Sequence, residues 1–268
     1  MRLLPIAFVL GLLGGCGDKV DHPGAAAGCD PNVQDCTYMP GETGGSPLPG
    51  GAGGSSSSGN GLVDLEGQVL AFQDDYFERG TVYGGTADIS ATGLSGARVK
   101  GTYDGTSFQL RNVLKAGDNW FLVEPDENVG VLPTVTAVDT RATTTDGYSI
   151  GLARRPDIEG IFQLSLTGEP LPDTAQVVLR IVDADNRSVP GVRAQFTAEV
   201  VAYRAQDTWD ATDEGQTDDT GLIFLGNVPA TPTLTVATVA LTGTVNARVE
   251  IRTLAGATTV VNAVVEDQ

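Results

Sequence analysis

The chain has 268 residues, of which 41% are hydrophobic, and it carries a formal net charge of −18. A length of this size accommodates one or two domains. The acids are spread along the chain rather than gathered in a tail, which gives an acidic surface that repels the phosphates of nucleic acids. The charge therefore argues against a nucleic-acid partner. An acidic surface favours solubility and is compatible with calcium binding.

The first 16 residues have the layout of a bacterial export signal. Arg2 precedes an apolar run over residues 3–13, and two glycines then stand directly before Cys16. The run is shorter than the ~20 residues that a membrane-spanning helix needs, and small residues are typical of a signal-peptidase cleavage site. The segment Leu13-Gly-Gly-Cys16 resembles the lipobox of bacterial lipoproteins. This resemblance implies that residues 1–15 are removed and that Cys16 is lipidated.

The lipobox resemblance implies a membrane partner and a place in the cell envelope. Each buried acyl methylene contributes ~0.8 kcal/mol, so two or three acyl chains would hold the protein stably on a bilayer. Gly17, rather than an aspartate, follows Cys16, and in lipoproteins of two-membrane bacteria this pattern implies the outer membrane. The alternative is an ordinary signal peptide with a chance cysteine.

Residues 16–61 are rich in Gly, Pro and Ser and show no apolar periodicity. Such a stretch buries too little surface to offset its ordering entropy, so it predicts a disordered, flexible tether. A mean reach of about 35–40 Å follows from ~5–6 Å × √n for a flexible chain.

The tether contains Cys29 and Cys36, which are an even pair if the third cysteine carries lipid. In an oxidising compartment we expect these two to form a local disulfide. A metal site with Asp30, Asp35 and His22 is the alternative, although the spacing does not match the common zinc patterns.

Residues 62–172 are predicted to form a first β-sandwich domain. Short apolar runs, such as Trp120-Phe-Leu-Val123, are separated by turns rich in Gly, Asp and Pro. Residues 161–166 alternate in hydrophobicity and are predicted as a strand, and no long segment shows the 3.6-residue period of a helix. Short strands with frequent turn signals are typical of an all-β sandwich or barrel.

The segment Glu169-Pro-Leu-Pro172 is predicted to separate this domain from a second β-sandwich over residues 173–268. The clearest strand in the second domain has apolar residues at every other position, namely Val245, Ala247, Val249 and Ile251. This pattern indicates an antiparallel strand with one face in a core and one in water. The expected fold class is all-β, with two Ig-like or prealbumin-like antiparallel sandwiches.

Two stretches of the second domain carry a family resemblance. One is the segment from Asp183 to the strand entry Pro190-Gly-Val192, and the other runs from Thr217-Asp-Asp-Thr-Gly221 to Asn227-Val-Pro229. They resemble carboxypeptidase regulatory-like domains, which are transthyretin-like sandwiches and accessory to the catalytic unit. Asp and Gly suit a tight turn, and Gly221 is expected to need a positive φ. Residues 104–113 contain a weaker copy of the second signature.

The chain lacks the residue patterns of common enzymes. His22 is the only histidine and lies in the predicted tether, which excludes a Ser-His-Asp triad or a histidine zinc site in the folded part. Asp74, Asp75 and Glu78 are interpreted as solvated surface acids rather than a glycosidase pair. We therefore expect no catalytic residue, no resident metal and no cofactor.

Calcium is the remaining cofactor hypothesis. Two loops offer hard oxygen ligands, from Asp183, Asp185 and Asn186 in one and from Asp213, Glu214, Asp218 and Asp219 in the other. A complete calcium loop needs more ligands in register. The competing interpretation is that these side chains close turns on their own backbone.

A ligand contact is hypothesised around Trp209, which lies in a polar stretch expected to be a loop, with Asp207, Asp210 and Asp213 nearby. Two function classes follow: a structural or protein-interaction module, or a carbohydrate-binding module that stacks sugars on Trp209. An exposed tryptophan favours the second class, and a buried one that caps the core favours the first.

Overall fold

The computed structural model describes residues 61–77, 79–92, 98–115, 119–126, 130–141, 148–212 and 214–265. The amino-terminal part contains the strands β1 (Leu62–Phe72), β2 (Gly80–Val82), β3 (Ala87–Thr92), β4 (Arg98–Tyr103), β5 (Phe108–Leu114), β6 (Asn119–Pro125), β7 (Thr134–Val138) and β8 (Tyr148–Leu152). A helix, α1 (Arg155–Leu164), follows β8. The carboxyl-terminal part contains β9 (Thr174–Val182), β10 (Val192–Gln195), β11 (Val200–Ala205), β12 (Thr208–Asp210), β13 (Leu222–Pro229), β14 (Thr235–Gly243), β15 (Ala247–Thr253) and β16 (Thr258–Val264). The predicted all-β fold is confirmed.

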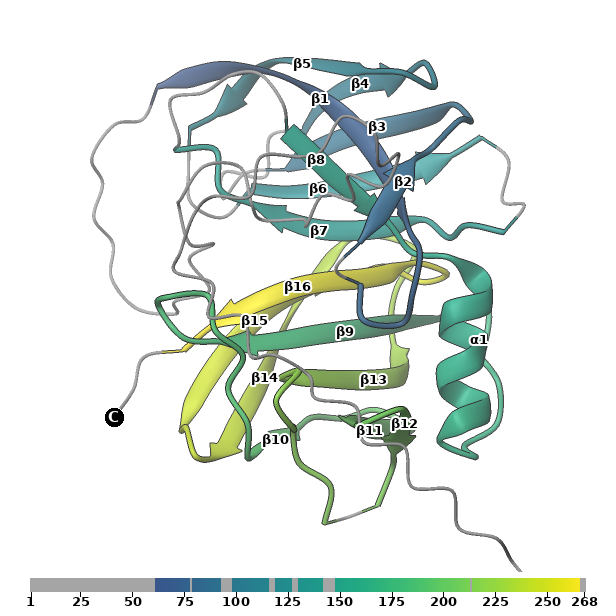
Figure 1. Cartoon of the computed structure of the whole chain (residues 1–268). Coiled ribbons are helices and arrows are strands. Elements are labelled where there is room, and N and C mark those ends of the chain that lie inside the picture. Colours follow the sequence, from purple (N-terminus) through teal and green to yellow (C-terminus); the bar gives the residue numbers. More distant parts are fainter. Residues whose placement is uncertain are drawn as a thin grey trace, which may run out of the picture. The chain divides into compact units, whose positions relative to one another are not determined.

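The strands form two sheets. One has the order β12-β11-β13-β9-β16-β7-β6-β3-β4-β5-β1-β2, with β8 paired to β1, and the other has the order β10-β14-β15. Most neighbours are antiparallel, but β8 runs parallel to β1, and β16 runs parallel to both β7 and β9. Because β16 lies between β9 and β7, strands from both sides of position 172 share one sheet (Figure 1). The predicted domain boundary at that position stays a prediction, and strand pairing crosses it.

Alternation of side chains along the strands builds the cores. In the carboxyl-terminal part, the two sheets face each other across a core that includes Val177, Leu179, Ile223, Val249 and Ile251. The predicted strand with alternating apolar positions is confirmed, since β15 buries Val249 and Ile251 and exposes Arg248 and Glu250.

The amino-terminal part has its own hydrophobic core, formed by side chains that project from one face of the long sheet. It is built from inward-facing residues such as Val69, Ile89, Leu110, Phe121 and Val123. These are every second residue of their strands, so the residues between them point to the other face of the sheet. That alternation positions the polar side chains of β3, β4 and β6 described below.

The strand predicted over residues 161–166 is wrong, because most of this segment belongs to α1. Pro156 stands in the first helical turn, where its missing N–H costs no hydrogen bond. Ile158, Ile161 and Phe162 are buried on one side of the helix, at the i, i+3, i+4 spacing of a helical face. No helix in the described part of the chain has the length and apolar character needed to cross a membrane.

The turn predicted at Gly221 is confirmed, since its φ is +69°. A Cβ at this position would lie 2.5 Å from the carbonyl oxygen of Ile181. Glycine is therefore required here by both the backbone conformation and the close approach of β9.

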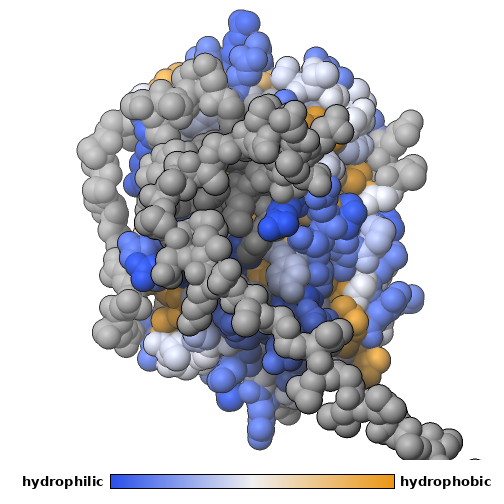
Figure 2. Space-filling view, in the orientation of Figure 1, coloured by the Kyte–Doolittle hydropathy of each residue, from blue (hydrophilic) through white to orange (hydrophobic). Residues whose placement is uncertain are grey.

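Where Figure 2 colours the surface by hydropathy, it is mostly hydrophilic, with hydrophobic residues in small areas. Leu164 and Leu166 at the end of α1 are among the exposed apolar side chains, and Leu166 is 91% exposed. Scattered exposed apolar residues are normal for a soluble surface.

Candidate functional site

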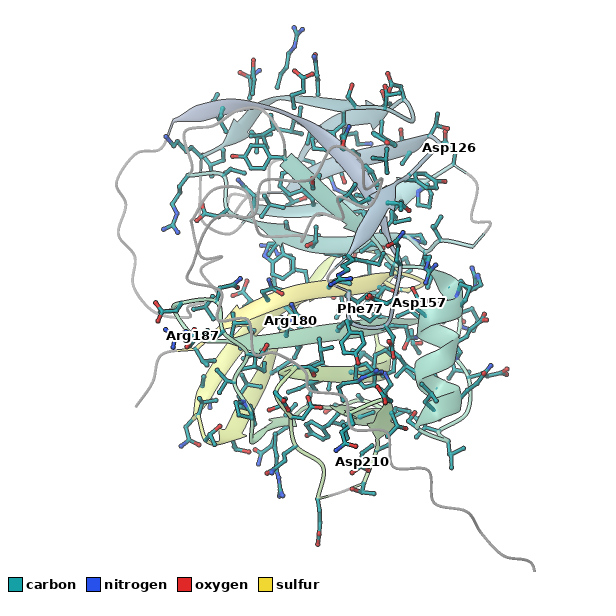
Figure 3. All side chains as sticks on the ribbon, viewed as in Figure 1. Phe77, Asp126, Asp157, Arg180, Arg187 and Asp210 are labelled. Carbon is teal, nitrogen blue, oxygen red and sulfur yellow. The ribbon has the colours of Figure 1, made fainter. Side chains whose placement is uncertain are left out.

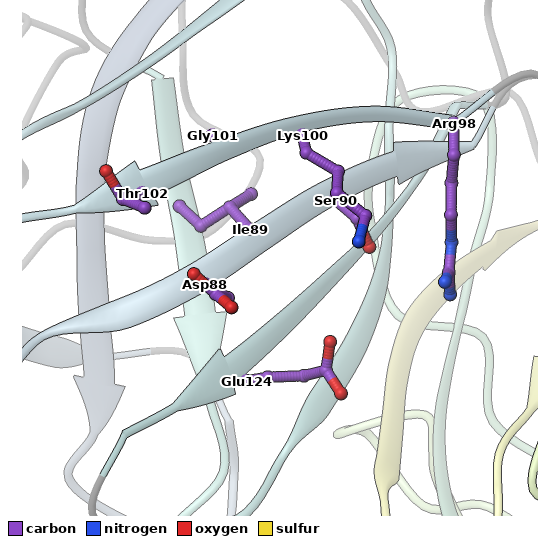
Figure 4. Close-up of a pocket in the computed structure, with 8 residues that line it drawn as sticks. All are labelled: Asp88, Ile89, Ser90, Arg98, Lys100, Gly101, Thr102 and Glu124. Carbon is purple, nitrogen blue, oxygen red and sulfur yellow. The ribbon is translucent and has the colours of Figure 1, made fainter.

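A groove of about 340 Å³ lies over strands β3, β4 and β6 of the amino-terminal part (Figure 4). Its polar lining residues are Asp88, Ser90, Arg98, Lys100, Thr102 and Glu124. We call this feature the charged groove. Sequence analysis missed it, because none of its residues forms a local motif.

The register of the three strands arranges these side chains in rows. Asp88 pairs with Thr102 on one side and with Glu124 on the other. The next row on the same face contains Ser90 opposite Lys100, and the third row contains Arg98 opposite Thr92. Since Ile89 points into the core, Asp88 and Ser90 point outward. Pairing therefore places two acids at one end of the groove and two bases toward the other.

The four charged side chains of the groove are exposed. Within the described residues, no ion pair or hydrogen bond joins any of them to another side chain. Asp88 and Glu124 stand directly opposite each other, and like charges in this position destabilise a sheet. The repulsion between these two carboxylates therefore destabilises the free protein, and a cationic group bound between them would relieve it.

Ser90 forms the floor of the groove. The residue is only 5% exposed, and its hydroxyl has no hydrogen-bond partner in the described part of the chain. Figure 4 shows the side chain of Lys100 extending across Ser90. A buried hydroxyl without a partner is destabilising. Chemically, the groove presents exposed charges of both signs, which suits recognition by ion pairs and charge-assisted hydrogen bonds.

Trp209 lies on the short strand β12 and not in the expected loop. It is 2% exposed, and its ring meets that of Phe224 edge-on at a centroid distance of 6.1 Å. Its Nε1 donates a hydrogen bond to Oδ2 of Asp75 at 3.0 Å. Neither face of the indole is open for stacking, and burial is the arrangement that favours the structural or protein-interaction class.

The partner of Trp209, Asp75, is not a solvated surface acid, and this interpretation is corrected. Asp75 forms an ion pair with Arg204, whose side chain is only 4% exposed. The Arg204 guanidinium also lies 4.3 Å from the centre of the Tyr76 ring, and its Nε donates to the carbonyl of Gln206 at 2.8 Å. We call Asp75, Tyr76, Arg204 and Trp209 the interlock, because it joins the loop after β1 to the hairpin β11–β12. The one local sequence signal for the interlock was Arg204, a basic residue within an otherwise mostly apolar strand.

Asp74, which precedes Asp75 of the interlock, interacts electrostatically with Asp157 and Arg180; Figure 3 labels these two residues. Burial raises the pKa of Asp74 above its usual 3.8, and the carboxylates of Asp75 and Asp157 add to this, while a hydrogen bond from the Tyr76 N–H opposes it. Burial lowers the pKa of Arg180 to about 10, an effect that Asp74 opposes. Arg180 therefore stays charged at neutral pH.

The acids predicted around Trp209 do not form an open site with it. Asp207 is exposed, whereas Asp210 accepts hydrogen bonds from the N–H and hydroxyl of Thr212 at 2.9 and 3.1 Å. Asp213 lies outside the described residues. The proposed ligand contact stays a prediction that the burial of Trp209 does not favour.

The loops considered for calcium close turns on their own backbone. Asp183 accepts hydrogen bonds from the N–H groups of Asp185 and Arg187 at 2.9 and 2.8 Å. Burial acts to raise the pKa of Asp218, but hydrogen bonds from Thr220 and Gln206 outweigh it, so the pKa lies below 3.8. In the part of the chain that the structure describes, no three His, Cys, Asp or Glu residues are grouped to hold a metal ion.

Cys16, Cys29 and Cys36 lie outside the described residues. The predicted lipidation and disulfide therefore stay predictions.

Comparison with known proteins finds no matching family model and no matching curated protein. Among solved structures, the chain is similar to the TIE protein of Bacillus anthracis, with 13% identity, a TM-score of 0.23, and coverage of 77% of this chain and 34% of that one. A streptococcal ancillary pilin gives 11% identity, a TM-score of 0.22, and coverage of 76% and 69%. The pilus backbone protein of Streptococcus pneumoniae gives 11% identity, a TM-score of 0.23, and coverage of 73% and 60%. The chain thus spans about a third of the length of the first of these proteins, and likeness at this level assigns neither a partner nor an activity.

Proposed function

We propose that this chain is a non-catalytic, lipid-anchored protein of the cell envelope that binds another protein through the charged groove. The observation that carries the proposal is the set of four exposed charges around Ser90 that have no ion-pair partner among the residues that the structure describes. Unpaired like charges and an unsatisfied buried hydroxyl both destabilise the free protein. A ligand that pairs with the exposed charges recovers their part of this free energy on binding.

The scaffold of the groove favours binding because it holds these side chains in fixed rows. β3 is hydrogen-bonded to β4 on one side and to β6 on the other, over six residue pairs each. The sheet already fixes the backbone positions of the binding groups, so only their side chains are ordered when a ligand arrives.

A protein partner fits the groove better than a glycan does. Sugar sites usually include an aromatic face for stacking, and no residue that lines the groove is aromatic. Trp209, the tryptophan considered for this role, is buried. The carbohydrate hypothesis is tested with a glycan array, on which we expect no binding.

The anchor rests on the segment Leu13-Gly-Gly-Cys16 and on the composition of residues 16–61. In this proposal the lipid on Cys16 holds the protein at the outer membrane and the tether lets the folded part reach its partner. Cys16→Ser is expected to move the protein out of the detergent phase in Triton X-114 partitioning. Unchanged partitioning would contradict the anchor and leave the groove proposal standing.

Site-specific photo-crosslinking tests the groove. A photoreactive phenylalanine derivative is placed at Gln109, which is exposed on β5, the strand next to β4. The matched control carries it at Thr238, which is exposed on β14 of the other sheet. We expect one defined crosslinked protein in intact cells from position 109 and not from position 238. Equal crosslinking from both positions, or none from position 109, would contradict the proposal.

A further inference from the structure

We infer that the groove recognises an extended peptide segment that carries a Lys or Arg and, two residues away on the same face, an Asp or Glu. This inference rests on the proposed binding function of the groove and names the chemistry of its partner.

The spacing of the rows is the first argument. Thr102, in the row of the two acids, and Lys100, in the next row, are two residues apart on β4. Two residues of strand span about 6.6–6.8 Å, and successive side chains on one face of any extended peptide have the same spacing. An extended segment lying along β4 therefore presents side chains in step with the rows of the groove.

The order of the charges is the second argument. Asp88 and Glu124 together face one position, which suits a single ammonium or guanidinium group. Lys100 and Arg98 lie two residues apart on β4, so a carboxylate placed in the second row lies beside Lys100, with Arg98 in the next row. A segment with the opposite order along this axis meets like charges at both ends and is repelled.

The mode of binding follows from the position of the strands. β3, β4 and β6 are interior strands whose neighbours already occupy both edges. A partner cannot extend the sheet through backbone hydrogen bonds, so recognition relies on side chains. The bound segment would therefore lie over the outward-facing side chains of β3, β4 and β6, above Ser90, which is buried beneath Lys100.

The inference is tested with the full chain and blocked peptides. The probe is acetyl-Gly-Lys-Gly-Glu-Gly-amide, with charges two residues apart. The spacing control is acetyl-Gly-Lys-Glu-Gly-Gly-amide, whose charges point to opposite faces when extended, and the uncharged control replaces both charged residues by Gln. Binding is followed by NMR titration of the amides of β3 and β4.

We expect the probe to bind about tenfold more tightly than either control and to weaken as salt is raised, because exposed ion pairs are screened. Equal affinity for the probe and the spacing control overturns the inference.

Charge reversal sharpens the test. The double variant Asp88→Lys/Glu124→Lys is expected to lose the probe and to prefer acetyl-Gly-Glu-Gly-Glu-Gly-amide. If this variant is unfolded by circular dichroism, Asp88→Asn/Glu124→Gln replaces it and is expected to lose the preference for the probe over the uncharged control. An unchanged preference in the folded variant overturns the inference.

Failure of the inference and failure of the proposed function are distinguishable. If position 109 crosslinks a partner in cells while the probe binds no better than its controls, the groove binds a protein of other chemistry and the peptide inference is overturned. If the probe also fails and position 109 crosslinks nothing, the proposed function falls with it.

Discussion

The interlock and the charged groove both contain acidic and basic residues, but these residues are mostly buried and paired in the interlock and exposed and unpaired in the described part of the groove. In the interlock, Arg204 is buried and its charge is matched by Asp75 and covered by Tyr76. In the groove, Lys100 and Asp88 stand exposed in adjacent rows and are matched by nothing in the described chain.

The difference shows that partners and burial, rather than residue type, decide what a charge does. A buried charge needs a partner from its own chain, because without one its desolvation is unfavourable. An exposed charge needs none and stays available to a ligand. The interlock therefore stabilises the fold, while the groove is expected to contribute little to stability.

The largest expected effect comes from Arg204→Ala. This change removes one partner of a mostly buried ion pair, and we expect it to lower the free energy of unfolding by about 3 kcal/mol. The measurement is urea-induced unfolding. Arg187→Ala is the matched control: Arg187 is 72% exposed and pairs with Asp185, so its loss should cost less than about 1 kcal/mol. Equal effects of the two changes would remove the distinction between interlock and surface.

A smaller loss is expected from Trp209→Phe. Phenylalanine keeps most of the contact with Phe224 but cannot donate the hydrogen bond to Asp75. Loss of a bond to a charged acceptor should cost about 1.5–3 kcal/mol, and the retained Arg204 pair places our estimate at about 1.5 kcal/mol. Thermal unfolding measures it. Unchanged stability together with altered ligand binding would assign Trp209 to recognition instead of the interlock.

The groove acids are expected to behave in the opposite way. Asp88→Asn/Glu124→Gln relieves the repulsion between carboxylates that face each other across β3 and β6. We expect the stability to stay the same or to rise by less than about 1 kcal/mol. Urea unfolding at low salt is the measurement, since screening weakens the effect at high salt. A clear destabilisation would show that these acids hold the fold, as Asp75 does.

The smallest effect concerns an exposed acid that does have partners. Asp104 accepts hydrogen bonds from the N–H groups of Ser107 and Thr106 and from the Thr106 hydroxyl, and these hold its pKa at about 2, below the ordinary 3.8. A depressed folded-state pKa gives stability that is present above pH 3.8 and is lost as the pH falls toward 2. Asp104→Asn should therefore make stability less dependent on pH in this window. Acid-unfolding curves that coincide would contradict the prediction.

The sequence alone determined those features that depend on neighbours along the chain. The alternation of apolar residues predicts β15, and the clustered Asp and Gly residues predict the turn at Gly221, because a strand face and a tight turn are local properties. The turn at Asp183 also follows from its own segment, since its carboxylate bonds the N–H groups of residues two and four positions later. A local periodicity can also mislead, because residues 161–166 alternate like a strand, and only the buried face of α1 identifies the helix.

The tertiary structure decided the interlock, the shared sheet and the groove. Trp209 and Asp75 are 134 residues apart in sequence. Nothing in the sequence around either residue indicates that the indole donates its hydrogen bond to this particular acid. The rows of the groove depend on the register between β3, β4 and β6, and a slip of one residue would turn Ser90 inward and Ile89 outward. Register is set by the whole core and not by the residues that line the groove. For this reason the residues we propose for binding could not be singled out from the sequence, although the all-β fold that carries them could.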